Sequence, residues 1–572
     1  MKTWIAKIKD SGPWIVFFEI FVIAQLLLIF VFNLTHLKYE AGFDSSAAMA
    51  QAMEIWNQKS IFLKHWDYQS TLGLDSVIIP ASIFYGITHN IFLAYGIADC
   101  LGVLLYIYIF RDIFKMLQLP KLVRMIVYVL LLTPYSLEPL GYMPMMFTGA
   151  AYYIIKVLIP IMLIDILLKI RLGIPVRRYL HILITYFAAV YLTALSCGLY
   201  LLICGLFPII LYELFTVICS GSFKNFLSKN TLLLAASLVI YGLGYASAKI
   251  YGADIFTNEM VLTTAENFVN NFAKCIVGIA ELFGALPNQK IVITSAFGIH
   301  YLSHMAAFLL FVIILIATIK SVRPLSGLLK NGQTDSPVQT VAGMVCCIIA
   351  VNLAVLILTD TFEFRYHLIP VVSGFLIVGI GIGGLVAWLK AHPNPLIFTS
   401  AMASIAIIWL LCNIVFYYYY TSRNNYETST AITGYVQEHS DCDLVYFIGD
   451  SDSEIIEVAR IARLLENRLN IIDGISVGSF LGWGASRTYY DPMETFDKVI
   501  IVCTDETYDS IEPYYRRDMT KLGTVEGYTL YELTDILSPE EYEKEPEDKA
   551  DDESASDDEG DTMSGSDTDT EY

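Results

Sequence analysis

Two residues that lie far apart in the sequence, Asp44 and Arg365, have side chains suited to a group transfer onto a hydroxyl. Asp44 stands in the stretch Gly42–Ala47, and its carboxylate could take the proton of an attacking hydroxyl as a general base. The Arg365 guanidinium could stabilise a departing phosphate by charge-assisted hydrogen bonds. Each residue also has a structural interpretation. Asp44 could cap a helix whose apolar stripe lies on the membrane surface, and Arg365 could anchor a helix at the interface or pair with Glu363.

Other polar residues are candidates for substrate binding. Asp67 and Asp75 follow Asp44 in the same loop, where each could contact substrate or be an ordinary loop residue. His300 and His304 are spaced i, i+4 and share a helix face, where they could bind a metal or a phosphate. No third metal ligand stands near them in the sequence, so interfacial packing is the simpler interpretation. The sequence therefore requires no metal, and a divalent metal cofactor is left open.

The elements that must position these residues are membrane-spanning helices. Of the 572 residues, 56% are hydrophobic and 16% are charged, whereas soluble domains have roughly 45–50% and 25%. Apolar runs of about 20 residues, long enough to cross a hydrocarbon core, recur through residues 1–420. The sequence predicts a polytopic α-helical membrane protein with about eleven transmembrane helices. The predicted spans are 13–34, 90–110, 122–138, 151–168, 180–196, 199–219, 231–248, 301–319, 339–358, 368–389 and 396–420.

Ionisable residues inside these spans need partners or a polar cavity, because a charge is costly in hydrocarbon. One hypothesis is that Lys156 pairs with Asp99. The ionisable residues within the predicted spans include Glu19, Asp99, Lys156, Asp165 and Glu213.

The distribution of Lys and Arg predicts how the chain is threaded. With a cytoplasmic N-terminus, seventeen basic residues flank the spans on the inner side and seven on the outer side, in agreement with the positive-inside rule. The first span then acts as an uncleaved signal anchor. Two long loops, 35–89 and 249–300, and the C-terminal region lie outside. We therefore expect a multi-pass protein of the cell membrane whose function faces outward.

Residues 421–537 have the pattern of a small extracytoplasmic α/β domain. Short β-prone runs alternate with one segment of helical spacing. Cys442 and Cys503 both fall in this domain and could form a disulfide. The predicted strands are Leu444–Ile448, Asn470–Ile472 and Lys498–Cys503, and the predicted helix is Glu454–Leu469.

The last residues, 538–572, are almost entirely acidic, Ser, Thr and Gly, and predict a disordered acidic tail. The net charge of −20 is concentrated in the last 152 residues. No segment outside the membrane shows basic clustering, so nucleic acid is not an expected partner.

Two short motifs in this layout resemble the GT-C superfamily of membrane glycosyltransferases, in particular the protein O-mannosyltransferase and aminoarabinose transferase-like group. The Gly42–Ala47 stretch occupies the place of the family's Asp-Glu motif, with Ser45 where a Glu is common. The segment Phe362–Pro370 is similar to the Arg-Tyr-x-x-x-Pro segment at the outer start of a late span. The resemblance in layout covers residues 1–420, a transmembrane GT-C-like domain.

The resemblance implies that Asp44 is the catalytic base and that Arg365, Tyr366 and His367 lie near the phosphate of a lipid donor. Nucleotide sugars are not supplied outside the cytoplasm, so we expect a polyprenyl-phosphate-sugar donor and a glycan, lipid or protein acceptor, with membrane lipid around both. Residues that could contact these substrates are Glu40, Asp67, Asp75, His300 and His304.

Two other functions compete with this glycosyltransferase hypothesis. A transporter or flippase for a lipid-linked glycan would depend on intramembrane charges and on an alternating-access path. A non-catalytic cell-envelope scaffold would depend on its outer domain. A transferase depends instead on Asp44 and an outward cavity, joined to a lipid-facing groove, that Arg365 also faces.

Overall fold

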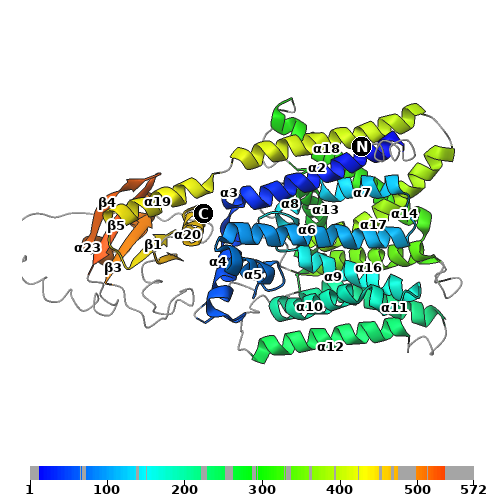
Figure 1. Cartoon of the computed structure of the whole chain (residues 1–572), viewed down its shortest axis with the longest axis horizontal. Helices are drawn as coiled ribbons and strands as arrows, with labels where there is room; N and C mark the ends of the chain where they lie inside the picture. The colour runs from blue at the N-terminus through cyan, green and yellow to red at the C-terminus, as the bar shows by residue number, and fades with distance from the viewer. Residues whose placement is uncertain are drawn as a thin grey trace, which may run out of the picture. The chain divides into compact units, whose positions relative to one another are not determined.

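A computed structural model of the chain (Figure 1) consists of two units, each described here by itself. The first unit comprises Met1–Thr430 with Arg460–Glu466, and the second comprises Ala431–Ala459 with Asn467–Tyr572. The structure describes residues 12–64, 66, 72–136, 141–149, 151–220, 228–250, 262–286, 292, 294–326, 329, 336–359, 364–391, 395–422, 424–449, 454–465, 469–474, 497–511 and 513–534. The predicted acidic tail, Glu363 and Asp67 lie outside these residues.

The first unit is a bundle of long apolar helices, which confirms the predicted polytopic membrane fold. Within the described residues, nine helices are long and apolar enough to cross a membrane. Each is a run of mainly apolar residues, and the helical conformation pairs the backbone polar groups within the segment. They are α2 (Pro13–Thr35), α6 (Ile91–Met116), α10 (Leu180–Cys197), η2 with α11 (Leu202–Leu206, Phe207–Ser220), α12 (Lys229–Ile250), α14 (Ala296–Val322), α16 (Pro337–Leu358), α17 (Leu368–Ala391) and α18 (Pro395–Ser422).

Two of the eleven predicted spans form helices that differ from these nine. Helix α7 (Lys121–Leu132) has only 12 residues and ends just before Pro134. Helix α9 (Ile154–Arg171) has 18 residues but carries Lys156, Asp165 and Lys169 in its interior. Both helices are buried along most of their length, so they belong to the centre of the bundle. The count of eleven crossings stays a prediction.

Most of the charges inside the bundle are paired. Lys169 lies 2.5 Å from Asp112 and 2.6 Å from Asp165. At the end of α9, a guanidinium nitrogen of Arg171 lies 2.5 Å from a carboxylate oxygen of Glu213. These contacts offset the cost of placing charges among apolar helices.

The hypothesis that Lys156 pairs with Asp99 is wrong. The Lys156 ammonium lies 3.0 Å from a carboxylate oxygen of Asp75, and both side chains are buried. Asp75 comes from the segment that precedes α5 (Ile78–Thr88), where the first long loop returns to the bundle. Asp99 is buried within α6.

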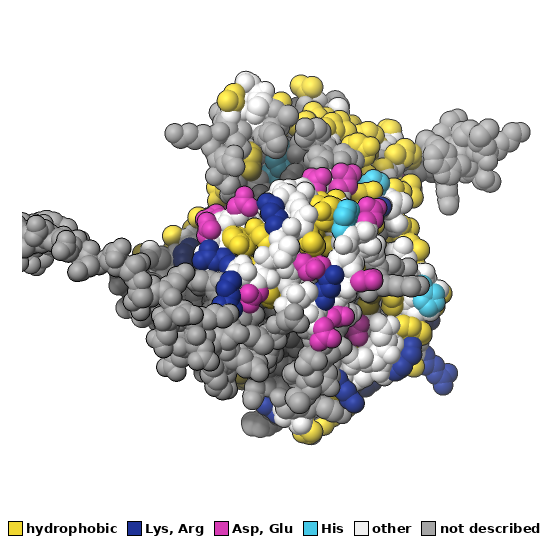
Figure 2. Space-filling model, turned by 90° about the vertical axis from the view of Figure 1, so that its left-hand side faces the viewer, with side chains coloured by type: hydrophobic (Ala, Val, Ile, Leu, Met, Phe, Trp, Pro, Cys, Tyr) yellow, Lys and Arg dark blue, Asp and Glu magenta, His cyan; other side chains and the backbone are white. Residues whose placement is uncertain are grey.

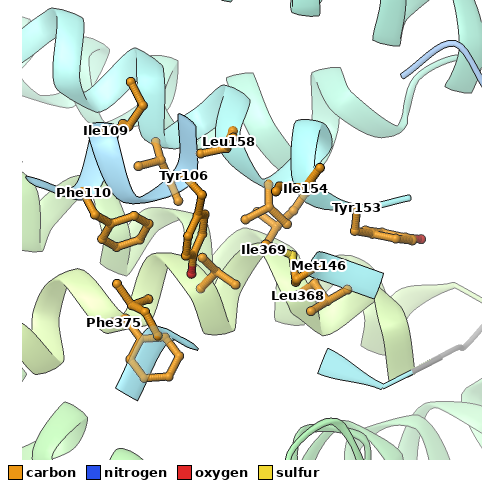
Figure 3. Packing of buried hydrophobic residues seen from close by; sticks show 14 of the residues in the cluster. Tyr106, Ile109, Phe110, Met146, Tyr153, Ile154, Leu158, Leu368, Ile369 and Phe375 are labelled. Atoms are coloured by element: carbon orange, nitrogen blue, oxygen red, sulfur yellow. The ribbon is translucent and has the colours of Figure 1, made fainter. Parts of the chain in front are cut away.

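The core is built where α6, α9 and α17 pack together (Figure 3). Tyr106 and Phe110 from α6, Ile154 and Leu158 from α9, and Phe375 from α17 are all buried. Rings and branched aliphatic side chains interdigitate here, which fixes the three helices against one another.

Helices α2 and α6 approach each other at backbone distance. A Cβ on Gly96 would lie 2.0 Å from the carbonyl oxygen of Asn33, so this crossing admits only glycine. The buried Asn33 amide donates a hydrogen bond of 2.8 Å to the carbonyl of Phe147, which follows α8 (Tyr142–Met146).

The loops of the membrane unit contain short helices that carry the candidate site. The first long loop forms α3 (Leu37–Glu40), α4 (Phe43–Gln58) and α5. The predicted loop between α12 and α14 contains α13 (Ala265–Leu282), and the turn η4 (Phe364–His367) leads into α17. A further turn, η1 (Val176–Arg178), precedes α10.

The second unit is a small α/β domain, as predicted. Its five strands have the order β2-β1-β3-β5-β4, with β2, β1 and β3 parallel and with β5 antiparallel to both β3 and β4. The elements after the bundle are α19 (Asn425–His439), β1 (Leu444–Ile448), α20 (Glu454–Leu464), β2 (Ile471–Gly474), β3 (Lys498–Cys503), α22 (Asp505–Ser510), α23 (Pro513–Asp518), β4 (Met519–Val525) and β5 (Tyr528–Thr534).

The two cysteines of this domain that could have formed a disulfide, Cys442 and Cys503, are both free thiols. Cys503 is buried at the end of β3 and contributes to the domain core.

On the face of the molecule shown in Figure 2, acidic and basic side chains are interspersed over the described surface.

Candidate functional site

Asp44 stands in the first turn of α4, and it is not the helix cap. The cap is Gly42, whose amide donates a hydrogen bond of 2.7 Å to the Ser45 hydroxyl, and Ser46 donates one of 2.7 Å to the Gly42 carbonyl. The structural interpretation of Asp44 as the N-cap is therefore wrong, because the helix begins two residues earlier. The Asp44 carboxylate lies near the positive end of the helix, with 36% of the side chain exposed.

The apolar stripe of helix α4 faces the protein, whereas we expected it to face lipid. Its apolar residues Ala48, Met49, Ala52 and Ile55 are buried against the protein, and the helix packs against α5 and α6. Trp56 is half-buried and lies under the Lys59 ammonium. The apolar stripe was read correctly, but protein covers it rather than lipid. This packing fixes the start of α4, and with it Asp44.

Arg365 lies close to Asp44, although the two residues are far apart in the sequence. The turn η4 places a guanidinium nitrogen of Arg365 3.8 Å from a carboxylate oxygen of Asp44. At this distance the two groups attract each other by charge without a direct hydrogen bond. The Arg365 side chain is 27% exposed, so both partners are accessible at one place. The two motif residues thus form one polar site.

Tyr152, which sequence reasoning missed, is the third member of the site. It lies in the turn before α9, and its hydroxyl donates a hydrogen bond to the backbone carbonyl of Asp44. A tyrosine hydroxyl is protonated at neutral pH, so it can act as the donor here. No motif marks this tyrosine in the sequence.

Tyr366 and His367 follow Arg365 but have different surroundings. The Tyr366 ring lies 5.7 Å from the ring of Tyr200, and the Arg365 guanidinium lies 5.8 Å from the Tyr366 ring. His367 is fully buried, so its side chain belongs to the core at the start of α17. A role for either residue in holding a phosphate stays a prediction, and the burial of His367 weighs against it.

Of the remaining predicted substrate-binding residues, Asp67 lies outside the described residues, and the other four have the following surroundings. Asp75 is occupied by its ion pair with Lys156, and Glu40 is buried at the end of α3. His300 and His304 are buried in α14 with their rings 4.0 Å apart, and His304 contacts the carbonyl of Phe283. Within the described residues, no group of three or more metal-binding side chains is found.

The Lys156 side chain, in the first turn of α9, connects this helix to the first long loop. Besides the contact with Asp75, its ammonium lies 4.9 Å from the ring of Tyr153, the neighbour of Tyr152. The ion pair therefore ties the returning part of the loop to the start of α9. It supports the turn from which Tyr152 reaches Asp44.

Comparison with known proteins identifies the fold class. No protein-family model and no curated protein matches the chain. Among solved structures, the bundle with its sheet domain has the GT-C-like membrane fold that the sequence motifs predicted.

The structure that carries this comparison is ArnT from Cupriavidus metallidurans bound to undecaprenyl phosphate. The TM-score is 0.54 at 13% sequence identity, over 92% of this chain and 99% of that chain. ArnT from the same organism in the apo state is also similar, with a TM-score of 0.42 and 11% identity over 91% and 98% of the two chains. At such low identity the likeness concerns the fold.

Proposed function

We propose that this protein is a membrane glycosyltransferase that moves a sugar from a polyprenyl-phosphate donor to a hydroxyl acceptor. The observation that carries the proposal is the contact of 3.8 Å between Arg365 and Asp44 on a GT-C-like fold. The similar ArnT structure was solved with undecaprenyl phosphate bound, which supports a polyprenyl phosphate as the lipid carrier here. A flippase or a scaffold would not need this pair.

In the proposed reaction, the acceptor oxygen attacks the anomeric carbon of the donor sugar. The bond between that carbon and the phosphate oxygen breaks, and its electron pair leaves with the lipid phosphate. Asp44 takes the proton of the attacking hydroxyl, while Arg365 stabilises the charge that develops on the phosphate. Attack opposite to the leaving group would invert the anomeric configuration.

The ion pair suggests how the base becomes available. A lipid phosphate can replace the Asp44 carboxylate beside the guanidinium of Arg365, because both are anions that arginine binds. Asp44 then loses its charged neighbour and can accept a proton. Donor binding would in this way precede activation of the acceptor.

The proposal is tested with purified full-length protein and a lipid-linked sugar. We expect the wild-type protein to consume the donor in the presence of a hydroxyl acceptor, and Asp44→Asn to be impaired by about 10²–10⁴-fold, the usual effect of losing a general base. Wild-type turnover by Asp44→Asn would reject Asp44 as the base. Absence of turnover with every donor class in correctly folded protein would reject the transferase.

A further inference from the structure

The second half of helix α6 carries a row of side chains whose chemistry changes along the helix. The row consists of positions 101, 104, 108, 111 and 115, which are spaced three or four residues apart and therefore lie on one helix face. Leu101 and Leu104 are each 47% exposed, Tyr108 is partly buried, and Arg111 and Lys115 are exposed. This face thus changes from apolar through aromatic to cationic toward the end of α6.

The start of α10 lies beside this row. The Tyr108 hydroxyl is 2.9 Å from Nε2 of His181, in the first turn of α10, and the Arg111 guanidinium carbon lies 4.8 Å from the centre of the Tyr108 ring. Tyr108 therefore joins Arg111 and His181 in one cluster. One turn further along α10, Ile184 is 61% exposed. Because the end of α6 meets the start of α10 and both helices are long enough to cross a membrane, their exposed apolar residues lie on the same side of this cluster.

The cluster carries positive charge that no carboxylate balances. Within the part of the chain that the structure describes, Arg111 forms no ion pair, and neither do the exposed Arg177 and Arg178 of the preceding turn η1. Asp112, the acidic neighbour of Arg111, is already paired with Lys169 at 2.5 Å. An exposed surface of this kind attracts an anion, and guanidinium groups are well suited to bind phosphate.

The position of the cluster along α6 indicates its depth in the membrane. The first long loop, which contains Asp44, joins α6 at Ile91. Arg111 follows Ile91 by twenty residues, which is roughly 30 Å along a helix and equals the thickness of a hydrocarbon core. The cluster therefore falls at the interface opposite to the first long loop, at the level of lipid headgroups.

We infer that the cluster of Tyr108, Arg111 and His181 binds an anionic phospholipid. Arg111 and His181 contact the headgroup phosphate, and an acyl chain lies along Leu104 and Ile184. The exposed apolar residues beside the charges select a lipid over free phosphate, and the unbalanced positive charge selects an anionic headgroup over a zwitterionic one. This site lies apart from Asp44 and Arg365, so the inference does not depend on the proposed function.

Binding is tested by native mass spectrometry of the full-length protein released from detergent, with phosphatidylglycerol and phosphatidylcholine of the same chain length. Arg111→Gln removes the charge, and Arg323→Gln, at the end of α14, is the matched exchange of an exposed arginine outside the cluster. We expect the wild-type protein and Arg323→Gln to prefer phosphatidylglycerol. We expect Arg111→Gln to bind it about fivefold more weakly, because one basic residue near the membrane surface contributes about that factor.

His181→Ala is a second variant of the cluster and should also weaken phosphatidylglycerol binding, because it removes a hydrogen-bond partner of the phosphate. Melting temperatures without added lipid verify that each variant is folded. Equal binding of both lipids by the wild-type protein would overturn the inference, as would equal losses in Arg111→Gln and Arg323→Gln. Displacement of phosphatidylglycerol by an equal concentration of glycerol 3-phosphate would also overturn it, because the site would then bind a soluble phosphate rather than a lipid.

Discussion

The Tyr152 hydroxyl donates a hydrogen bond to the backbone carbonyl of Asp44, and these two residues are 108 positions apart in the sequence. The bond joins the turn before α9 to the first turn of α4. Arg365 completes the site from a third region of the chain. The orientation of the Asp44 carboxylate thus depends on packing between elements that no local motif connects.

Tyr152→Phe should lower turnover without unfolding the protein. The change removes one hydrogen bond, worth about 1 kcal/mol, which corresponds to roughly a fivefold loss if it acts wholly on the barrier. Tyr108→Phe is the matched control, since it removes a tyrosine hydroxyl that contacts His181. Turnover and thermal stability are measured together. Equal turnover in both variants would show that Tyr152 does not position Asp44.

Asp44→Asn should leave the helix intact while removing the base. Ser45 supplies the capping contact at Gly42, so the stability of α4 does not depend on the Asp44 carboxylate. Glu54→Gln, in the same helix, is the matched exchange of a carboxylate for an amide. We expect near-wild-type melting temperatures for both variants and lost donor consumption only for Asp44→Asn. A large drop in the melting temperature of Asp44→Asn alone would return this residue to a structural role.

Two replacements of Arg365 should show whether activity requires only a positive charge or also the planar guanidinium group. Arg365→Ala should reduce turnover by about 10²–10³-fold, as expected for removal of a group that stabilises developing charge. Arg365→Lys should retain part of the activity, because a separation of 3.8 Å indicates attraction between charges rather than paired hydrogen bonds to Asp44. Steady-state kinetics with varied lipid donor provide the measurement. If the lysine variant is as inactive as the alanine variant, the planar geometry of the guanidinium is required.

Breaking the buried pair of Lys156 and Asp75 should destabilise the protein strongly. Lys156→Met leaves the Asp75 carboxylate buried without its cation, which typically costs about 3–5 kcal/mol. The control is Lys498→Met, which breaks the more exposed pair with Glu532 in the sheet domain and should change stability little. Thermal unfolding in detergent compares the two. Similar melting temperatures would mean that the buried pair contributes little.

The membrane orientation predicted from basic residues can be tested directly. The contact between Asp44 and Arg365 requires an even number of crossings between them. Six of the nine candidate spans in the described residues lie between Asp44 and Arg365, and the number becomes eight if α7 and α9 also cross. Both numbers are even. We expect a reporter fused after Tyr420 to be active only outside the cytoplasm. Cytoplasmic activity would reverse the predicted orientation.

The sequence was informative where a single physical effect dominates. Apolar length alone predicted the long spans, and β-prone runs predicted β1 and β3 with the bounds that the structure has. The hairpin of β4 and β5 was missed because β4 mixes polar with apolar side chains and has no fully buried residue. The turn between them, Glu526-Gly527, has the positive φ angles typical of tight hairpins, and Gly in that position was the available signal.

Within the candidate site, the sequence predicted the pair but not its surroundings. Asp44 and Arg365 could be found because each lies in a short motif. Tyr152 and the partner of Lys156 depend on how the first long loop folds back onto α9, and such contacts leave no periodicity in the sequence. The cap was misplaced because Asp44 is a good capping residue by type, whereas the backbone makes Gly42 the cap and Ser45 its hydrogen-bond partner.

The close crossing of α2 and α6 also bears on the order of biosynthesis. When α2 leaves the ribosome, neither Gly96 nor the carbonyl of Phe147 has been made, yet the Asn33 amide already needs an acceptor. In lipid an amide without a partner is unfavourable, so the first span remains an incomplete element until more than a hundred further residues have been translated. Chains that stall before Phe147 should therefore lack the hydrogen bond that completes this crossing.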